Sequence, residues 1–388
     1  MKKTMTALIT GAIAFGNAAA EADETKLHIA PTGRIMLDAA AYSPRKDLFT
    51  NGVAIPDIRL GIESSYGDWS ARIDACLAYG KISMRDIYIE YQPSATHRFT
   101  GGYITPEFGL NTPVQSCMKS SMEEMTSDVF TNATGRNIAL MYTCSTPFVW
   151  TAVSGYTDAT SLTEPANEQG KTSFGVANRT FLRHTPAEGA VAQAGFSSSW
   201  QSAIHERLTA PDGHSYTSPG YFDFAADFPS RVCSVGMLEA RVDDARSVMK
   251  LSPELLLMKG RLAIESQYYY MRVSRNGVLP AYRAKGAYGL LRCLLLGTGY
   301  SYDPSEGCID IPAPRSLELV AGFDITDADC HDAEIMGGLS RDLSLTLNYY
   351  FNSFMLARLR YSWTDVRGRT DMPDTHVNII QARFQINF

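Results

Sequence analysis

The last nine residues of the chain, 380–388, alternate strictly between apolar and polar side chains. Because successive side chains of a β-strand point to opposite faces, this segment predicts a strand with one apolar face and one hydrated face. The apolar positions are Ile380, Ala382, Phe384, Ile386 and Phe388, and the polar positions are Gln381, Arg383, Gln385 and Asn387.

The same alternation recurs in four other segments, 57–63, 69–77, 343–351 and 354–363. Charged residues occupy the polar face of these segments, and aromatic residues stand near the ends of the apolar face. A barrel with lipid outside and water inside has this pattern, whereas a lipocalin-like barrel would carry its apolar face inside. The predicted fold class is therefore all-β, a transmembrane antiparallel β-barrel. The content of 17 Phe, 20 Tyr and 30 Gly also favours sheet over helix.

Sixteen segments qualify as strands, an even number as bacterial single-chain barrels require. They are 33–42, 55–65, 69–78, 81–92, 97–104, 136–145, 147–157, 171–183, 189–200, 246–258, 261–273, 285–297, 315–325, 342–351, 354–365 and 376–388. With the C-terminus on the periplasmic side, the connections alternate between short inner turns and longer outer loops. We expect the outer loops at 43–54, 105–135, 158–170, 201–245, 274–284, 326–341 and 366–375. The outer turn at 79–80 is unusually short, and the inner connection at 298–314 is unusually long.

The N-terminus predicts a secretory signal peptide. Lys2 and Lys3 precede a short apolar run, and small residues follow at Ala18 to Ala20, so we expect cleavage after Ala20 or Ala22. The run is too short for a spanning helix, which needs about 20 apolar residues. The expected organisation is a signal peptide at 1–20, a short periplasmic segment at 21–32 and a transmembrane barrel at 33–388. The protein would reside in the outer membrane, in contact with its lipid bilayer.

Charge and cysteine content narrow the function. Without Lys2 and Lys3, the 35 basic side chains fall to 33 against 41 acidic ones, so no basic excess suggests a nucleic-acid partner. The seven cysteines include no C-x-x-C pair, and no His or carboxylate keeps ligand spacing with them, so we expect neither a metal site nor a cofactor. A Cys308–Cys330 disulfide is conceivable. Scattered histidines provide no nucleophile–base pair for a rim enzyme.

Several different motifs follow one another along nearly the whole mature chain, from Gly33 to Phe388. They are Arg59…Gly61 with Tyr66-Gly-Asp-Trp69, Arg85-Asp86-Ile-Tyr88-Ile-Glu-Tyr91, Gly101-Gly-Tyr-Ile-Thr-Pro-Glu-Phe-Gly109, Gly135-Arg136-Asn-Ile138, Glu265-Ser-Gln-Tyr-Tyr-Tyr-Met-Arg272, Leu317-Glu-Leu-Val320 and Leu347-Asn-Tyr-Tyr350. In this order they resemble the phosphate-selective porin O and P family. The terminal stripe of Phe384, Ile386 and Phe388 is similar to the C-terminal signal of outer-membrane barrels, which the barrel-assembly machinery recognises.

The resemblance implies a homotrimeric porin of sixteen strands whose third outer loop, here 105–135, folds into the pore. It implies passive diffusion of small solutes or ions, including anions such as phosphate. The charges available to a constriction in this loop are Lys119, Glu123, Glu124 and Asp128. One position departs from the family pattern: Thr105 stands where members commonly carry a lysine, followed by Pro106, Glu107 and Phe108.

Polar-face charges supply the candidates for the pore wall. Arg59, Arg72 and Arg85 recur thirteen residues apart, and a turn at Tyr66 and Gly67 would set Arg59 opposite Arg72 and Asp57 opposite Asp74. Such an arginine row beside an acidic row would either orient ions in a transverse field or merely consist of solvated, mutually neutralising charges. The full set of pore-lining candidates is Arg34, Arg59, Arg72, Asp74, Arg85, Asp86, Glu90, Arg136, Arg358, Arg360 and Arg383.

Two functions remain open at this point. The first is a diffusion porin with a weak anion preference or a slight cation preference, since the acidic row and Thr105 oppose the arginines. The second is a non-conducting barrel that acts as an adhesin or as a partner in a surface complex, for which the long 201–245 loop would be the contact surface.

Overall fold

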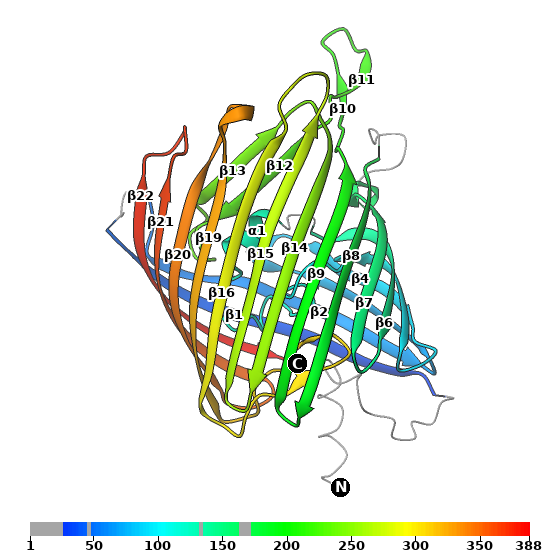
Figure 1. The fold of residues 1–388 in the computed structure, drawn as a ribbon, viewed down its shortest axis with the longest axis vertical. Coiled ribbons are helices and arrows are strands. Elements are labelled where there is room, and N and C mark those ends of the chain that lie inside the picture. Colours follow the sequence, from blue (N-terminus) through cyan, green and yellow to red (C-terminus); the bar gives the residue numbers. More distant parts are fainter. Residues whose placement is uncertain (1–25, 45–47, 132–134, 163–171) are drawn as a thin grey trace.

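The computed structural model describes residues 26–44, 48–131, 135–162 and 172–388. Sixteen antiparallel strands form one closed barrel, in which each strand pairs with its neighbours in chain order (Figure 1). The barrel strands are β1 (His28–Ser43), β2 (Gly52–Tyr66), β3 (Trp69–Cys76), β4 (Ser83–Tyr91), β5 (His97–Ile104), β6 (Asn137–Ser145), β7 (Val149–Thr157), β8 (Phe174–Ala187), β9 (Ala190–Ser202), β14 (Ala245–Lys259), β15 (Leu262–Arg275), β16 (Tyr282–Leu296), β19 (Ser316–Cys330), β20 (Ile335–Tyr350), β21 (Met355–Arg367) and β22 (Thr375–Asn387). The prediction of a sixteen-stranded transmembrane barrel is confirmed. The predicted signal peptide at 1–20 lies outside the described residues.

The first and last strands close the barrel by pairing with each other from Arg34 opposite Asn387 to Ser43 opposite Asn378. Strand β1 begins five residues before the expected segment, and His28 to Thr32 pair with β2 alone. Part of the segment expected at 21–32 is thus a strand extension.

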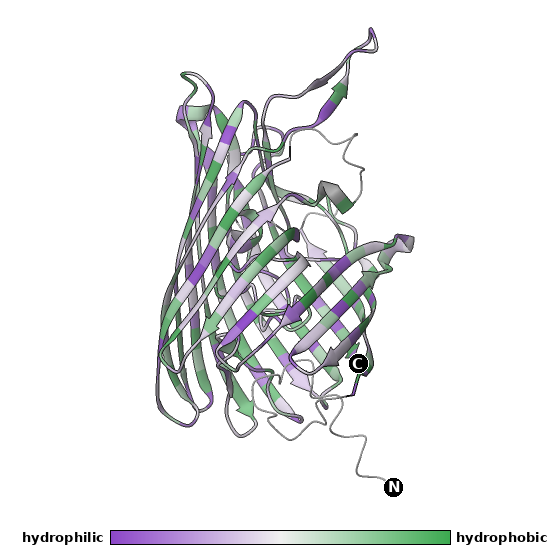
Figure 2. Ribbon diagram, turned by 90° about the vertical axis from the view of Figure 1, so that its right-hand side faces the viewer, coloured by the Kyte–Doolittle hydropathy of each residue, from purple (hydrophilic) through white to green (hydrophobic). Residues whose placement is uncertain are grey.

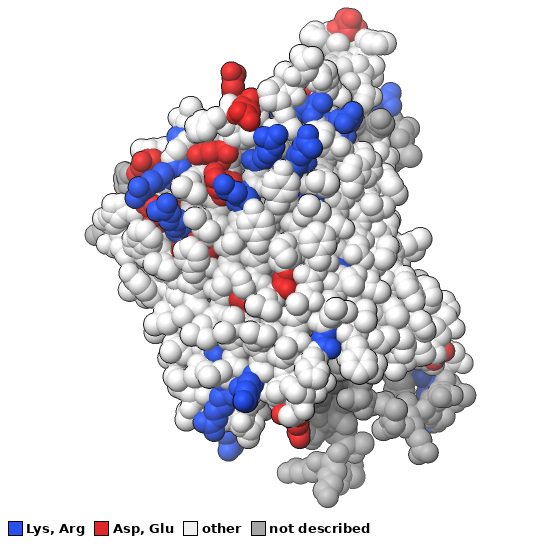
Figure 3. Space-filling view, viewed as in Figure 1, with Lys and Arg blue, Asp and Glu red and all other residues white. Residues whose placement is uncertain are grey.

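The two faces of the strands differ as the alternation requires. In β22, Gln381, Arg383 and Gln385 are buried toward the lumen, whereas Ile380 and Ile386 are exposed on the outside. Hydrophobic and hydrophilic residues alternate along parts of many strands (Figure 2). On the face seen in Figure 3, charged side chains gather toward the two ends and the middle is almost uncharged. Such an apolar band is the surface that a bilayer requires. Within the described residues, no helix is long and apolar enough to cross a membrane.

Aromatic side chains line the outside of the barrel at the inner ends of β3 to β6. Trp69 stacks on Tyr91 at 4.6 Å between ring centroids, and Phe99 lies 5.1 Å from Tyr142. Trp69 and Phe99 are about half exposed, at 52% and 47%. Amphipathic rings of this kind sit at the level of the lipid headgroups, so they mark one membrane interface.

The described parts of the connections between barrel strands contain three short hairpins and one α-helix. The third outer loop, residues 105–136, carries α1 (Thr126–Thr131), and the fifth carries the outer hairpin, β12 (Phe222–Asp227) with β13 (Gly236–Val242). The fifth loop also carries the tongue, β10 (Arg207–Thr209) with β11 (Ser215–Thr217), which projects beyond the barrel rim (Figure 1). The inner hairpin, β17 (Tyr302–Asp303) with β18 (Cys308–Ile309), occupies the connection between β16 and β19.

The outer hairpin and α1 share a hydrophobic core with the lumen side of the barrel. Phe130 of α1, Phe224 of β12 and Tyr282 of β16 belong to one buried cluster, which also takes side chains from β14, β15, β21 and β22. Phe224 stands 6.0 Å from Phe130 and 6.4 Å from Tyr282, measured between ring centroids. The lumen beside these strands is therefore filled with protein, and open space has to lie elsewhere.

The prediction of a long outer loop at 326–341 is wrong. Strand β19 runs to Cys330, β20 starts at Ile335, and the turn η4 (His331–Ala333) joins them. The glycines that resemble a loop serve close packing instead. A Cβ atom at Gly337 would come within 2.8 Å of the Ala328 carbonyl oxygen, and one at Gly338 within 3.1 Å of Leu238 in β13.

The Cys308–Cys330 disulfide that the sequence left open does not form. Cys308 belongs to the inner hairpin, whereas Cys330 ends β19 at the outer rim, and both thiols are free. The two residues approach opposite ends of the barrel, so no disulfide can join them.

Candidate pore and its charged lining

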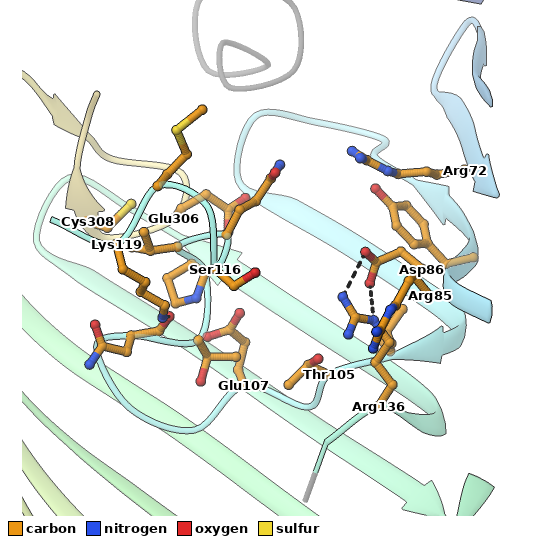
Figure 4. A pocket seen from close by; sticks show the side chains of 18 of the residues that line it. Arg72, Arg85, Asp86, Thr105, Glu107, Ser116, Lys119, Arg136, Glu306 and Cys308 are labelled. Carbon is orange, nitrogen blue, oxygen red and sulfur yellow. Dashed lines mark hydrogen bonds and ion pairs between the residues drawn. The ribbon is translucent and has the colours of Figure 1, made fainter. Parts of the chain in front are cut away.

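A cavity of about 620 Å³ lies inside the barrel, between strands β2 to β5 on one side and the inserted segments on the other. The inserted segments are residues 105–131 of the third outer loop, Arg231 of the fifth loop, and the inner hairpin with the residues after it, while Arg136 directly precedes β6 on the barrel side. Figure 4 shows Arg72, Arg85 and Arg136 facing Glu107, Ser116 and Glu306 across this space.

The two sides of the cavity carry different charge. The barrel side has five arginines and four carboxylates, namely Arg59, Arg72, Arg85, Arg98 and Arg136 with Asp57, Glu63, Asp86 and Glu90. The inserted side has two cations and six carboxylates, namely Lys119 and Arg231 with Glu107, Glu124, Asp128, Asp303, Glu306 and Asp310. The barrel side is nearly balanced, whereas the inserted side is strongly acidic.

A β-bulge brings Arg85 and Asp86 together in the cavity. Ile73 pairs with Ile87 and Ala75 pairs with Met84, so two residues of β4 oppose Asp74 alone. Strict alternation would send adjacent side chains to opposite faces, but a bulge re-aims one of them. Both side chains consequently line the cavity.

Asp86 is shared by two arginines. Arg136 binds its carboxylate through Nε at 2.8 Å and Nη2 at 3.0 Å, and Arg59 approaches through Nη1 at 3.4 Å. The Nε atoms of Arg59 and Arg85 are buried and have no hydrogen-bond partner within the described residues. The guanidinium groups around Asp86 therefore have donors left over.

The prediction that like charges face each other across β2 and β3 is wrong. Arg59 lies opposite Cys76, and Asp74 lies opposite Gly61. The turn consists of Gly67 and Asp68, with Tyr66 paired to Trp69, so the register differs from the one expected. Arg72 instead faces Glu63 and binds Asp74 through Nε at 2.9 Å.

Lumen-facing arginines hold the third outer loop against the barrel. Arg383 binds both carboxylate oxygens of Asp38 at 2.7 Å and one of Glu123 at 2.7 Å. Arg358 donates to the Lys119 carbonyl at 2.5 Å, and Arg34 donates to the Ser116 hydroxyl at 3.2 Å. The loop therefore has a fixed position along β1, β21 and β22.

The opposite strands hold the same loop through neutral and acidic groups. Asp324 of β19 accepts hydrogen bonds from the Ser127 amide at 3.0 Å and hydroxyl at 2.6 Å. Tyr269 of β15 donates to Asp128 at 2.7 Å, and the Oγ of Ser197 in β9 accepts the Gly109 amide N–H at 2.9 Å. Contacts on both sides of the lumen thus bracket the cavity.

Arg179 of β8 joins the third outer loop to the inner hairpin. It binds Glu254 through Nε at 3.1 Å and Nη2 at 3.0 Å, and its Nη1 reaches Glu107 at 3.4 Å. The same guanidinium donates to the carbonyl oxygens of Glu306 and Gly307, each at 3.3 Å. Burial raises the pKa of Glu107 to about 7, because the nearby Arg179 offsets only part of the cost of burying its charge.

The inner hairpin is fastened to β5, β7 and β8. Glu306 forms an ion pair with Arg98, the Trp150 indole N–H donates to the Ser305 carbonyl at 2.7 Å, and Arg183 donates to the Pro304 carbonyl. Sequence reasoning did not assign these residues to the cavity. The one available signal was the unusual length of the inner connection at 298–314.

The candidates from the sequence separate into two groups. Six of the wall candidates line the cavity: Arg59, Arg72, Arg85, Asp86, Glu90 and Arg136. The other five face the lumen outside its lining: Arg34, Asp74, Arg358, Arg360 and Arg383. Of the loop candidates, Lys119, Glu124 and Asp128 line the cavity, whereas Glu123 is buried between Arg383 and Arg231. In the described part of the chain, no three His, Cys, Asp or Glu side chains are grouped to hold a metal ion.

Comparison with known proteins agrees with this architecture. The sequence profile of the family described as "Phosphate-selective porin O and P" matches residues 30–388. No curated protein matches the chain.

Solved structures share the fold at low sequence identity. OmpT of Vibrio cholerae with loop L8 deleted is 10% identical, has a TM-score of 0.58, and the match covers 93% of this chain and 99% of that one. An anion-selective porin from Comamonas acidovorans is 8% identical and has a TM-score of 0.57, and the match covers 94% of this chain and 100% of that one. The outer membrane channel DcaP of Acinetobacter baumannii is 10% identical with a TM-score of 0.52, covering 93% and 97%.

Proposed function

The chain belongs to the phosphate-selective porin O and P family, and we propose that small solutes and ions cross the outer membrane through the cavity between β2–β5 and the inserted segments. The observation that carries this proposal is a space lined by charged side chains inside a closed barrel whose outer surface is largely apolar. Lipid cannot solvate these charges, so water has to fill the space.

The third outer loop and the inner hairpin would form the constriction together. Both are held by ion pairs and hydrogen bonds to lumen side chains, among them the buried pair of Arg383 with Glu123 and the partly buried pair of Arg98 with Glu306. Their burial against the opposite wall leaves the β2–β5 side as the route for solutes. Lys119, Glu124 and Asp128 are the loop charges on this route.

The charge of the lining argues against strong phosphate selectivity. Ten carboxylates and seven cations line the cavity, so the summed charge is negative. Rings or rows of acidic side chains favour cations, whereas arginine and lysine favour anions and phosphate. Arg59, Arg72 and Arg85 would offset the acidic side locally, which predicts a channel of weak selectivity with a slight preference for cations.

A homotrimer accounts for the uneven height of the barrel wall. Strands β3 to β7 have only eight or nine residues, whereas the barrel strands β14, β15, β16 and β19 to β22 have thirteen to sixteen. At about 3.3 Å per residue and a tilt near 45°, eight residues span roughly 19 Å, less than the apolar band of about 25 Å. Contact with other subunits on this side would spare the short wall from facing the full thickness of the bilayer. The terminal stripe of Phe384, Ile386 and Phe388 would be read by the barrel-assembly machinery.

One feature favours a second role at the cell surface. The tongue extends past the rim, and its Tyr216 is 47% exposed. An adhesin would use such a projection without needing conduction. The family and fold suggest a channel rather than an enzyme, and we propose no catalytic activity.

Conduction in a planar bilayer tests the proposal. Purified protein is added to one chamber, and we expect stepwise increases in current, each from one inserted molecule or trimer. Folded insertion is checked in parallel, because closed barrels resist dodecyl sulfate and migrate differently before and after boiling. Protein that migrates as a folded barrel and carries no current would reject the porin function and favour the surface role.

A further inference from the structure

We propose that the cavity binds a dipolar solute, one that carries a carboxylate at one end and an ammonium group at the other, such as a short peptide with free termini. The carboxylate would contact Arg59 and Arg85, and the ammonium group would face the carboxylates of the inserted side. This inference rests on the proposed function of the cavity as the pore, and it goes further by naming the class of solute.

The barrel side supplies unused donors for a carboxylate. Arg136 takes both carboxylate oxygens of Asp86, and Arg59 approaches Asp86 at 3.4 Å and Asp57 and Asp74 at 3.9 Å each. Arg59 is 8% exposed, and its Nε has no partner in the described part of the protein. Arg85 has a buried, unpartnered Nε and forms no ion pair with any described residue. The Arg85 side chain is only partly buried and lines the cavity, so its guanidinium can bind a ligand carboxylate through charge-assisted hydrogen bonds.

The inserted side supplies an excess of carboxylates for an ammonium group. Its two cations are committed elsewhere: Lys119 donates to the Asn111 carbonyl, and Arg231 binds Glu123 through Nε at 3.1 Å. Glu124 lines the cavity without an ion pair to any described residue. Glu107 has only the distant Nη1 of Arg179, whose Nε and Nη2 are both occupied by Glu254.

Size and lining composition favour an organic solute over a bare ion. The cavity of about 620 Å³ falls within the range of roughly 300–1,000 Å³ typical of small-molecule sites. Tyr88, Ile104, Val114 and Met141 contribute apolar surface among the charged groups. These side chains would contact the body of a peptide while its two ends meet opposite charges. A site of purely positive charge would suit an inorganic anion, and the acidic inserted side excludes that description.

Three matched probes separate the two ends of the solute. Alanylalanine carries both charges, N-acetyl-alanylalanine carries only the carboxylate, and alanylalanine amide carries only the ammonium group. Each is added to conducting channels near pH 7.5, where most of Glu107 and most of the peptide ammonium groups are charged, and the concentration that halves the ion current is measured. Isothermal titration of the detergent-solubilised protein with the same probes detects binding even if the channel carries no current, so a failure of the porin function is distinguished from a failure of this inference.

Alanylalanine is expected to bind about tenfold more tightly than either single-charge probe, the size of one charge-assisted hydrogen bond. Arg85→Ala should weaken alanylalanine and the acetylated probe but not the amide, and Glu107→Gln should weaken alanylalanine and the amide but not the acetylated probe. Arg283→Ala is the control, because this arginine pairs with Asp332 in an exposed position outside the cavity lining. Equal binding of all three probes, no binding of any, or tightest binding of the acetylated probe would overturn the proposal.

Discussion

Phe388 and Gly33 exchange both of their backbone hydrogen bonds, at 2.7 and 2.8 Å, across the seam where the chain's last strand meets its first. The Phe388 ring stands over the glycine, so a Cβ atom at Gly33 would lie 2.5 Å from the ring Cζ and 2.9 Å from the Arg59 carbonyl oxygen. Closure of the barrel therefore depends on the absence of a side chain at position 33.

Gly33→Ala should destabilise the closed barrel. The added methyl group has to displace both an aromatic ring and a backbone carbonyl, and overpacking of this kind costs about 1–3 kcal/mol. The midpoint of urea unfolding in lipid vesicles, followed by migration of unboiled samples, measures the loss. Gly155→Ala is the matched control, since a Cβ atom there meets nothing within 4 Å. Equal midpoints for the two variants would contradict the seam's tight packing.

Deletion of Phe388 should reduce the amount of protein in the outer membrane. The deletion removes the last member of the apolar stripe and the two hydrogen bonds to Gly33. We expect less heat-modifiable protein in outer-membrane fractions and more degradation products in the periplasm. An unchanged membrane yield would count against the assembly-signal interpretation.

Replacement of residues 302–309 by a short Gly-Ser turn should increase single-channel conductance. The inner hairpin occupies the lumen beside Arg98, Trp150 and Arg179, so its removal widens the route without breaking a barrel strand. The matched control removes the tongue at 207–217, which lies beyond the rim, and should leave conductance unchanged. If the two deletions give the same conductance as the full chain, the inner hairpin does not constrict the pore.

Selectivity should change with pH near neutrality. With a pKa of about 7, the Glu107 carboxyl group is charged above this pH and neutral below it. Arg179, Glu306 and Arg98 are the charged groups that affect this pKa most strongly. Acidification from about pH 8 to about pH 6 therefore removes a negative charge from the acidic side and should lower the ratio of cation to anion permeability. Glu107→Gln should show the lower ratio at both pH values. A wild-type ratio that changes no more than that of the variant would exclude Glu107 as the titrating group.

The strands were predictable because each one faces two solvents, and lipid and water impose a period-two pattern that is visible residue by residue. The register was not, because a small error in the position of the turn moves every cross-strand pair: Arg59, expected opposite Arg72, lies opposite Cys76. The β-bulge at Arg85 and Asp86 has no local sequence signal. The paired glycines 337 and 338 suggested a loop, since their role in packing against β13 depends on a partner a hundred residues away.

The cavity was predictable only in part. Charges on the polar face of the alternating strands identified the barrel side of the cavity. The same pattern also selected Arg358 and Arg383, which hold the third outer loop. Which lumen charges face open space depends on where the inserted segments pack. That packing arises from long-range contacts such as Phe130 with Phe224, which alternation does not encode.

The reversal potential across a salt gradient tests the central claim, that ions pass between the charged barrel wall and the acidic inserted segments. We predict a small reversal potential of the cation-selective sign for the wild type and a clear shift toward cations when Arg59, Arg72 and Arg85 are all replaced by alanine, since screening confines each charge to about 8 Å and these three line the cavity. Arg85→Ala alone breaks no ion pair among the described residues and should shift the potential in the same direction if the triple variant folds poorly. A reversal potential that is identical in the wild type and in both variants would contradict the claim.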